Sequence, residues 1–250
     1  MTLPAPFHEA DGITLYCGDA LDLAPLLQPV DAIITDPPYG ETKLEWDRWP
    51  DGWPSIVAPL APQMWCYGSF RMFWERREEF EGWKLAQDII WEKHNGSGLL
   101  ADRFRRVHEL ALHFYQGDWE QLYKVPPMIS IGEERIRKPI SRQRKPQHWG
   151  GLETGEQYAY DGMRLARSVI FARSCHGYAV NETQKPLAIV APLLDYSVPV
   201  GGTVVDLFAG SGTVGVVARA QGKRAILIEK RESQCQQIVK RLAQGELSLL

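Results

Sequence analysis

The stretch VVDLFAGSGTVG, from Val204 to Gly215, decides the fold. An apolar run ends at Asp206, and a glycine-rich turn then leads into the helix-like segment 213–222, TVGVVARAQG. The three glycines of this turn, at positions 210, 212 and 215, match the G-x-G-x-x-G pattern of loops that bind a nucleotide cofactor between a strand and a helix. The competing interpretation is a glycine turn without a ligand.

The segment that follows supports the cofactor interpretation. Residues 224–229, RAILIE, are typical of a buried strand, and Glu229 ends it where such proteins commonly have the acceptor for ribose hydroxyls. The loop alone fits either a dinucleotide or S-adenosylmethionine, because both carry an adenosine ribose. Asp206 favours S-adenosylmethionine, since a carboxylate repels a pyrophosphate and suits an ammonium group.

Strands and helices alternate on either side of this loop. The sequence predicts strands at 13–17, 30–35, 63–69, 85–93 and 107–115, and helices at 20–28, 185–198 and 233–245. This alternation is the signature of an α/β fold. From about residue 116 to 175 the periodicity weakens, and glycine and proline recur.

Composition limits the classes of protein to consider. The 250 residues suit one large domain or a core with a small insertion, and the net charge of -3 restricts any nucleic-acid surface to a local patch. The four cysteines form no C-x-x-C pair, so we expect no metal site and no disulfide framework. Because the N-terminus resembles no signal peptide and no long apolar run occurs, we expect a cytoplasmic protein without a membrane segment.

A second informative stretch, AIITDPPYGET, spans residues 32–42. Proline fixes its own φ and holds the preceding residue extended, so Asp36 and Pro37 are both rigid. The stretch therefore presents a carboxylate, a free carbonyl and the Tyr39 ring at the end of a strand. The competing interpretation is a surface turn, because Asp-Pro and Pro-Pro are common in turns.

Together the two stretches resemble the DNA amino-methyltransferases, which methylate the exocyclic nitrogen of adenine or cytosine. Further segments carry the same resemblance: ITLYCGD (13–19), IIWEKHNG (89–96), RRVHELALHFYQG (105–117) and ETQKPLAIV (182–190). The likeness covers most of residues 13–115 and 181–242, and Glu182 departs from the proline that the family often has there. Because the DPPY segment precedes the cofactor loop, the order of motifs resembles the β group, a circular permutation of the methyltransferase sheet.

The resemblance implies an overall organisation. We expect a doubly wound, mostly parallel, Rossmann-like methyltransferase sheet, circularly permuted. Residues 1–115 would form the catalytic part of the core, 116–175 a small inserted target-recognition region, and 176–250 the cofactor-binding part. The implied cofactor is S-adenosylmethionine.

The DPPY segment has a chemical rationale in this family. An exocyclic amine is a poor nucleophile because its lone pair is delocalised into the ring. The Asp36 carboxylate and the Pro37 carbonyl can accept its two hydrogens, Pro38 keeps the strip rigid, and Tyr39 offers a π-face to a base rotated out of the duplex. The nitrogen then attacks the methyl group directly. No Pro-Cys pair, which carries the nucleophile of enzymes acting on carbon 5 of cytosine, occurs in the chain.

The tryptophan-rich segment 40–53, GETKLEWDRWPDGW, is expected to be a loop closing over the flipped base. For the cofactor, the resemblance assigns Asp19 to the adenine amino group, although a helix N-cap is an equal alternative. Thr183 and Lys185 are assigned to the methionine end, with a solvated lysine as the alternative for Lys185. The complete expected set is Asp19, Ala20, Thr183, Lys185, Asp206, Phe208, Ala209, Gly210, Ser211, Gly212, Thr213 and Glu229.

A basic run, RIRKPISRQRK at residues 135–145, lies in the irregular segment. It contains no acid, and it is where the β group keeps its target-recognition region. We therefore expect it to contact the phosphates of double-stranded DNA, with a solvated loop as the alternative. The expected residues are Arg135, Arg137, Lys138, Arg142, Arg144 and Lys145, and a second basic cluster comprises Arg103, Arg105 and Arg106.

The function expected from the sequence is a DNA methyltransferase acting on adenine N6, because family members with Asp in the tetrapeptide more often take adenine. Cytosine N4 is the first alternative. RNA or protein-glutamine methylation is less favoured, since those enzymes usually carry Asn at the position of Asp36. A NAD-dependent oxidoreductase gives the DPPY segment no role, and an inactive DNA-binding relative does not explain its intact residues. Dimers are common in the β group, so the resemblance also allows a homodimer.

Overall fold

The computed structural model describes residues 2–97, 102–130, 163–175, 179–181 and 183–244. The chain divides into two compact units, one formed by residues 1–125 and 168–250 and the other by residues 126–167. Within the described ranges, no helix is long and apolar enough to cross a membrane.

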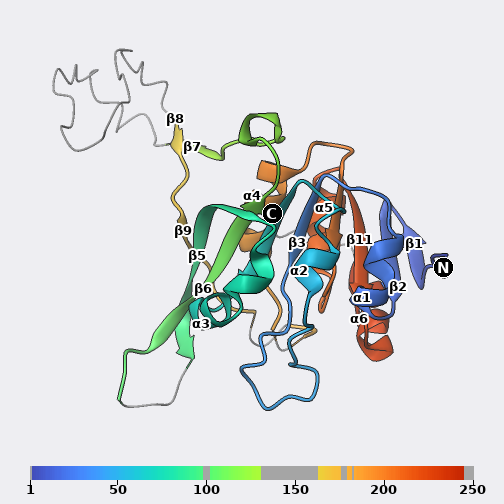
Figure 1. Cartoon of the computed structure of the whole chain (residues 1–250), viewed down its shortest axis with the longest axis horizontal. Coiled ribbons are helices and arrows are strands. Elements are labelled where there is room, and N and C mark those ends of the chain that lie inside the picture. The colour runs from blue at the N-terminus through green and yellow to red at the C-terminus, as the bar shows by residue number, and fades with distance from the viewer. Residues whose placement is uncertain (1, 98–101, 131–162, 176–178, 182, 245–250) are drawn as a thin grey trace. The chain divides into compact units, whose positions relative to one another are not determined.

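The larger unit is built on a nine-stranded sheet with the order β1-β2-β11-β10-β3-β4-β6-β5-β9 (Figure 1). The five adjacent strands β2, β11, β10, β3 and β4 run parallel to one another, and β9 is parallel to β5. Antiparallel pairs join β1 to β2 and link β4, β6 and β5. The strands are β1 His8–Ala10, β2 Ile13–Cys17, β3 Ala32–Thr35, β4 Gln63–Gly68, β5 Lys84–Ser97, β6 Arg106–Tyr115, β9 Val169–Phe171, β10 Thr203–Asp206 and β11 Arg224–Glu229.

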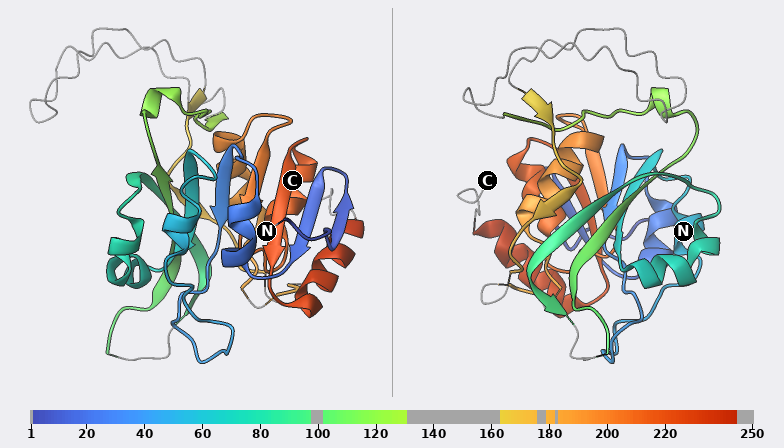
Figure 2. Two further views of the ribbon diagram at one scale, coloured as in Figure 1. Left: turned by 45° about the vertical axis from the view of Figure 1, so that its right-hand side comes forward. Right: turned by 90° about the vertical axis from the view of Figure 1, so that its left-hand side faces the viewer.

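Helices cover both faces of this sheet (Figure 2). One face is covered by α4 (Leu187–Ser197), α5 (Thr213–Ala220) and α6 (Glu232–Ala243). The other face carries the short helices α1 (Ala20–Leu23), α2 (Trp53–Ile56) and α3 (Phe70–Glu75). Three 3-10 turns complete the unit: η1 Ala24–Leu26, η2 Arg77–Phe80 and η3 Trp119–Gln121.

Strand residues alternate between two hydrophobic cores. Ile34 and Val204 belong to the core under α4 to α6, whereas their neighbours Ile33 and Val205 belong to the core on the opposite face. All four are completely buried, as expected for the centre of a sheet covered on both sides. This two-sided burial explains why the central strands are continuous apolar runs.

The α/β architecture expected from the sequence is confirmed. The helix expected at 20–28 ends at Leu23, and the chain continues as the 3-10 turn η1. Pro25 stands at the start of this turn and lacks the N–H that an α-helix would need there. Residues 116–125 and 168–175, which the sequence analysis assigns to the insertion, belong to the larger unit. The reason is pairing: β9 hydrogen-bonds to β5, and the Val125 amide donates to the Tyr196 carbonyl.

The described part of the smaller unit contains one antiparallel pair, β7 (Met128–Ser130) with β8 (Met163–Leu165). The basic run 135–145 lies outside the described residues.

The glycine loop joins β10 to α5 through a left-handed turn. Gly212 has φ of 72°, and a Cβ added there would lie 2.8 Å from Cγ2 of Ile238 on α6. Glycine is therefore required at this position both for its backbone conformation and for the close approach of α6. Gly212 serves packing, and its neighbours Gly210 and Ser211 face the pocket described below.

We predict that Gly212→Ala lowers the free energy of unfolding more than Gly201→Ala does. Gly201 also has a positive φ, of 75°, but nothing lies within 4 Å of an added Cβ. Gly201→Ala should therefore cost only the left-handed backbone, roughly 1–2 kcal/mol, while the Ile238 contact adds about 1–3 kcal/mol to Gly212→Ala. Urea denaturation of both variants measures the difference. Equal losses would contradict the packing role.

Candidate active site

Four carboxylates stand at the carboxyl ends of four adjacent parallel strands. Asp19 follows β2, Glu229 ends β11, Asp206 ends β10 and Asp36 follows β3. Because these strands are neighbours in the order β2-β11-β10-β3, the acids form a row with a strand spacing of about 4.8 Å. Ligands of open α/β sheets bind at this edge.

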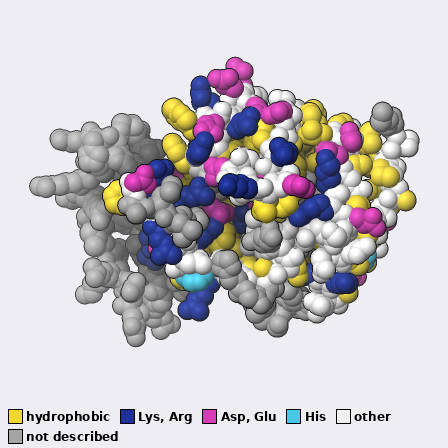
Figure 3. Space-filling model, turned by 90° about the horizontal axis from the view of Figure 1, so that it is seen from below, with side chains coloured by type: hydrophobic (Ala, Val, Ile, Leu, Met, Phe, Trp, Pro, Cys, Tyr) yellow, Lys and Arg dark blue, Asp and Glu magenta, His cyan; other side chains and the backbone are white. Residues whose placement is uncertain are grey.

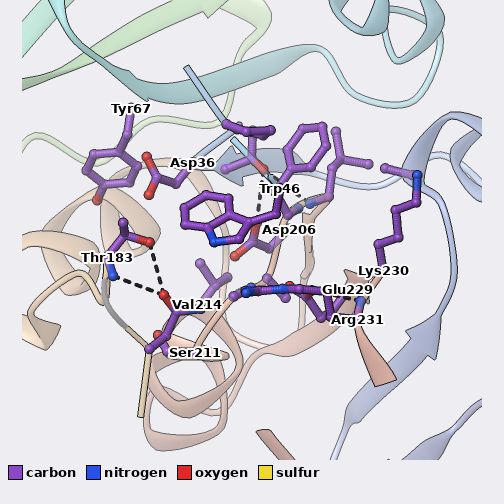
Figure 4. Close-up of a pocket in the computed structure, with 18 of the residues that line it drawn as sticks. Asp36, Trp46, Tyr67, Thr183, Asp206, Ser211, Val214, Glu229, Lys230 and Arg231 are labelled. Atoms are coloured by element: carbon purple, nitrogen blue, oxygen red, sulfur yellow. Dashed lines mark hydrogen bonds and ion pairs between the residues drawn. The ribbon is translucent and has the colours of Figure 1, made fainter. Parts of the chain in front are cut away.

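A cavity of about 490 Å³ runs along this row (Figure 4). All four carboxylates line it, and so do Tyr67 and Trp46. Every residue expected to bind the cofactor lines this cavity except Gly212. Those that line it are Asp19, Ala20, Thr183, Lys185, Asp206, Phe208, Ala209, Gly210, Ser211, Thr213 and Glu229.

The amide groups of the glycine loop are largely used within the protein. The Gly210 N–H donates to Glu229 Oε2 at 2.9 Å, the Ala209 N–H to the Ile228 carbonyl at 2.9 Å, and the Gly212 N–H to the Ala209 carbonyl at 2.7 Å. A pyrophosphate-binding loop points such amides at the phosphate. This loop instead presents carboxylates, so the site suits a cationic ligand better than a dinucleotide.

Asp206 is buried and points into the cavity. Its Oδ1 accepts from the Thr35 hydroxyl at 2.9 Å and from the Phe208 N–H at 3.2 Å. Burial raises the pKa of Asp206 to about 7, although both hydrogen bonds oppose this rise. An ammonium group beside Asp206 would stabilise the ionised form.

Asp19 has two partners already. It caps α1 by accepting from the Leu21 N–H at 2.9 Å, which is the alternative role considered for it, and its other oxygen accepts from Lys230 Nζ at 2.8 Å. Its side chain also lines the cavity, so contact with an adenine amino group stays a prediction.

The order of acids along the edge fits S-adenosylmethionine. Asp19, Glu229 and Asp206 can accept hydrogen bonds from an adenine amino group, ribose hydroxyls and an ammonium group, in the order in which the molecule carries them. Asp36 stands next to Asp206 in the row. The donor and acceptor chemistry of the cavity thus fits this cofactor.

The DPPY segment lies beside a second cavity of about 220 Å³. Asp36, Pro37, Pro38 and Tyr39 all line it, together with Trp91. Tyr39 donates its hydroxyl to Asp36 Oδ1 at 2.5 Å, so it holds the carboxylate from one side. The stacking role expected for the Tyr39 ring stays a prediction.

Lys185 lies at the junction of the two cavities rather than only at the methionine end of the first. Its ammonium donates to Asp36 Oδ2 and lies 3.5 Å from Glu109 Oε2. Glu109 also pairs with Lys93, which gives a network of two lysines and two carboxylates in which Lys185 is buried and the other three are partly buried. Glu109 and Lys93 carry no local signal of this role in the sequence, because their proximity depends on the pairing of β5 with β6.

The segment 40–53 lines the larger cavity through Glu45, Trp46 and Arg48. The Trp46 indole crosses the cavity towards Arg231, whose guanidinium carbon lies 5.2 Å from the ring centroid (Figure 4). The Asp47 carboxylate fixes the turn by accepting from the Gly40 and Thr42 amides at 2.8 and 2.7 Å. The segment therefore lines the larger cavity and, through Thr42, Trp46 and Asp47, also the smaller cavity beside the DPPY segment described above.

Arg241 supports the glycine loop from α6. Its buried guanidinium donates to the Ser211 carbonyl at 3.0 Å and to the Thr213 hydroxyl at 2.9 Å. In the sequence Arg241 is one of several charged residues of an amphipathic helix, and only the packing of α6 against the loop identifies its role.

The face that carries the carboxyl ends of the strands holds many Lys and Arg side chains among acidic ones (Figure 3). The six expected DNA contacts, Arg135, Arg137, Lys138, Arg142, Arg144 and Lys145, lie outside the described residues. Over the described ranges, no group of three or more His, Cys, Asp or Glu side chains could hold a metal ion.

The chain is similar in sequence to known DNA methyltransferases. The model of the DNA methylase family of N6 and N4 enzymes matches residues 30–240. The type II methyltransferase M.ScaI of Streptomyces caespitosus is 22% identical, over 99% of this chain and 86% of that protein. The type II methyltransferase M.HinfI of Haemophilus influenzae is 24% identical, over 92% of this chain and 68% of that protein.

Two solved structures share the fold. The M1.HpyAVI complex with S-adenosylmethionine has a TM-score of 0.61 at 24% identity, over 92% of this chain and 99% of that chain. The PvuII DNA methyltransferase, which is specific for cytosine N4, has a TM-score of 0.56 at 16% identity, over 96% of each chain.

The chain belongs to the N6/N4 family of DNA amino-methyltransferases, because the family model spans most of its length. As a member of this family it takes its methyl group from S-adenosylmethionine.

We predict that cofactor affinity weakens below neutral pH through Asp206. A cationic ligand favours the ionised carboxylate, and the pKa of Asp206 is raised to about 7 in the free protein. Binding at lower pH therefore requires Asp206 to lose a proton, which costs roughly tenfold in affinity for each pH unit well below 7. Calorimetric titration with S-adenosylmethionine from pH 7.5 to 5.5 measures this dependence.

The control is Asp206→Asn, which keeps an acceptor for Thr35 and Phe208 but does not titrate. The affinity ratio of wild type to variant should fall as the pH falls. A constant ratio would show that Asp206 does not contact the ammonium group of S-adenosylmethionine.

Proposed function

We propose that the protein methylates N6 of adenine in double-stranded DNA, by direct attack of a flipped base on the methyl group. The observation that carries the proposal is that two cavities meet at Asp36. The larger one, with acids at four strand ends, suits the cofactor. The smaller one, lined by Pro37 and Tyr39, suits a base.

S-adenosylmethionine, when bound, supplies an electrophilic methyl group. Asp36 and the Pro37 carbonyl accept the two amine hydrogens and localise the nitrogen lone pair, which points it at the cofactor cavity. Each carboxylate oxygen can accept two hydrogen bonds, so Asp36 can receive the amine while its present partners remain. Once the nitrogen carries the methyl group, Asp36 is the adjacent acceptor for the proton it must lose.

Cytosine N4 is the second candidate base. Its amine offers the same two hydrogens, and the cytosine-specific PvuII DNA methyltransferase shares the fold. Adenine is favoured by the Asp at position 36, from the resemblance described above. Enzymatic digestion of DNA methylated by the protein, followed by mass spectrometry, distinguishes N6-methyldeoxyadenosine from N4-methyldeoxycytidine.

We predict that Asp36→Ala abolishes methyl transfer and leaves the affinity for S-adenosylmethionine within about tenfold. Loss of one preorganised charged contact in such a site costs roughly 3–4 kcal/mol of barrier. Transfer of a tritiated methyl group to DNA and calorimetry measure the two effects.

Asp31→Ala is the matched control, because Asp31 lies just before the same strand and its carboxylate accepts from the Thr203 N–H at 2.7 Å. This control should lose stability and keep methyl transfer. Near-native turnover by Asp36→Ala would contradict the proposed role of Asp36 as an acceptor for the amine.

For DNA binding we propose phosphate contacts from the basic run 135–145. Replacing Arg142, Arg144 and Lys145 with Ala should weaken binding to every duplex. The slope of log K against log salt should become shallower by roughly one unit per lost contact, up to about three units. Cofactor affinity should not change.

Titrations of target and scrambled duplexes at several salt concentrations separate the interpretations. Loss confined to the target duplex would indicate base reading instead of phosphate contact. An unaltered slope with unaltered affinity would place the DNA-binding surface elsewhere.

A further inference from the structure

Lys185 is a buried lysine held between two carboxylates. Its side chain is only 8% exposed, and its ammonium pairs with Asp36 and lies near Glu109. The same ammonium lies 5.2 Å from the centre of the Tyr67 ring. Burying such a group is costly unless it is paired, so its position reflects these two acids.

The backbone on both sides of this network is fixed. Lys185 precedes Pro186 and is therefore biased towards an extended conformation, and its carbonyl accepts from the Thr213 hydroxyl at 3.2 Å. Glu109 lies opposite Trp91 in the β5–β6 pair, and Lys93, two residues along β5, binds its other oxygen. Lys185 thus links the start of α4 to Asp36, which follows β3, and to Glu109 on β6.

We propose that Lys185 is a positioning residue for the reaction, which orients the Asp36 carboxylate and keeps it ionised, with Glu109 holding the lysine in place. The inference rests on the proposed role of Asp36. It differs from the contact with the methionine end of the cofactor expected from the sequence.

The charges around Asp36 give this arrangement its effect. Burial raises the pKa of Asp36, the Lys185 ammonium opposes the rise, and Glu109 adds to it, while the Tyr39 hydroxyl stabilises the ionised form. Cys66, Tyr67 and Asp206 are the other titratable groups that face Asp36. Among the described residues, Lys185 is the cation in contact with Asp36. Its removal should therefore favour a protonated Asp36, which is a weaker acceptor for its amine hydrogen.

Glu109 offers the lysine a second position. In the described part of the chain, Glu109 Oε2 is a buried oxygen without a hydrogen-bond partner, and Lys185 Nζ is 3.5 Å from it. If the ammonium shifts within the network when an amine binds to Asp36, this oxygen offers it a second partner.

The experiment compares wild type with Lys185→Met, Lys185→Arg and Glu109→Gln. One measurement is the pKa of Asp36, from carbon-13 carboxyl NMR with Asp36→Asn to assign the signal. The other is the pH dependence of kcat for methyl transfer to DNA, together with KM for S-adenosylmethionine. Lys223→Met is the matched control, because Lys223 is also buried and pairs with Asp195 at 2.7 Å, but lies at the amino end of β11.

Lys185→Met should raise the pKa of Asp36 and shift the acid limb of kcat upward by about one unit or more, the scale of a lost opposite charge. Glu109→Gln should shift both in the opposite direction, because it removes a like charge. Lys185→Arg retains the charge, so it should keep the pKa of Asp36 and the acid limb of kcat near their wild-type values. Lys223→Met should lower the stability of the protein without changing this pKa or this limb.

An unchanged pKa of Asp36 in Lys185→Met and Glu109→Gln would overturn the inference, whatever the activity. A rise in KM for the cofactor with an unmoved acid limb would also overturn it, in favour of the methionine-end role. Absence of methyl transfer by the wild type would instead overturn the proposed function, so the two failures are distinguishable.

Discussion

The structure depends on the parallel pairing of β3 with β10, two strands that are far apart in the sequence. Val204 and Val205 pair with Ala32 and Ile33, and the Thr35 hydroxyl donates to Asp206 at the carboxyl end. Thr35 Oγ1 also accepts from the Leu207 N–H at 3.2 Å, so one side chain joins the starts of the DPPY segment and the glycine loop. This pairing is what brings Asp36 beside a cavity built mainly from the C-terminal part of the chain.

The site has two electrostatic environments that meet at Asp36. Along the cofactor cavity, acids predominate at the strand ends, and the loop amides are satisfied by the protein, so the cavity favours a cation. Around Asp36, the buried Lys185 and the partly buried Lys93 balance the partly buried carboxylates of Asp36 and Glu109. Lys185 and Lys93 thus supply positive charge beside Asp36 and Glu109, whereas Lys230 and Arg231 in the cofactor cavity pair with Asp19 and Glu229.

Much of this could be predicted from the sequence because it depends on short local patterns. The apolar run before Asp206, the glycine turn and the helix after it are consecutive in the sequence. Of the 12 residues expected to bind the cofactor, 11 line one cavity. The exception, Gly212, has the left-handed φ expected of a loop glycine, but its missing Cβ makes room for Ile238 of α6. A sequence pattern does not distinguish a glycine needed by a ligand from one needed by a neighbouring helix.

The sequence by itself determined the α/β class, the glycine loop, the rigid DPPY segment and the acids at the strand ends, because proline and glycine geometry and apolar periodicity act locally. Only the tertiary structure decided which of these acids are neighbours, since strand order depends on pairing between distant segments. It also decided the partners of Lys185, the support of the loop by Arg241 and the position of Trp46 over the cavity. These contacts join residues from different elements, and a long polar side chain gives no local signal of the partner that packing will bring to it.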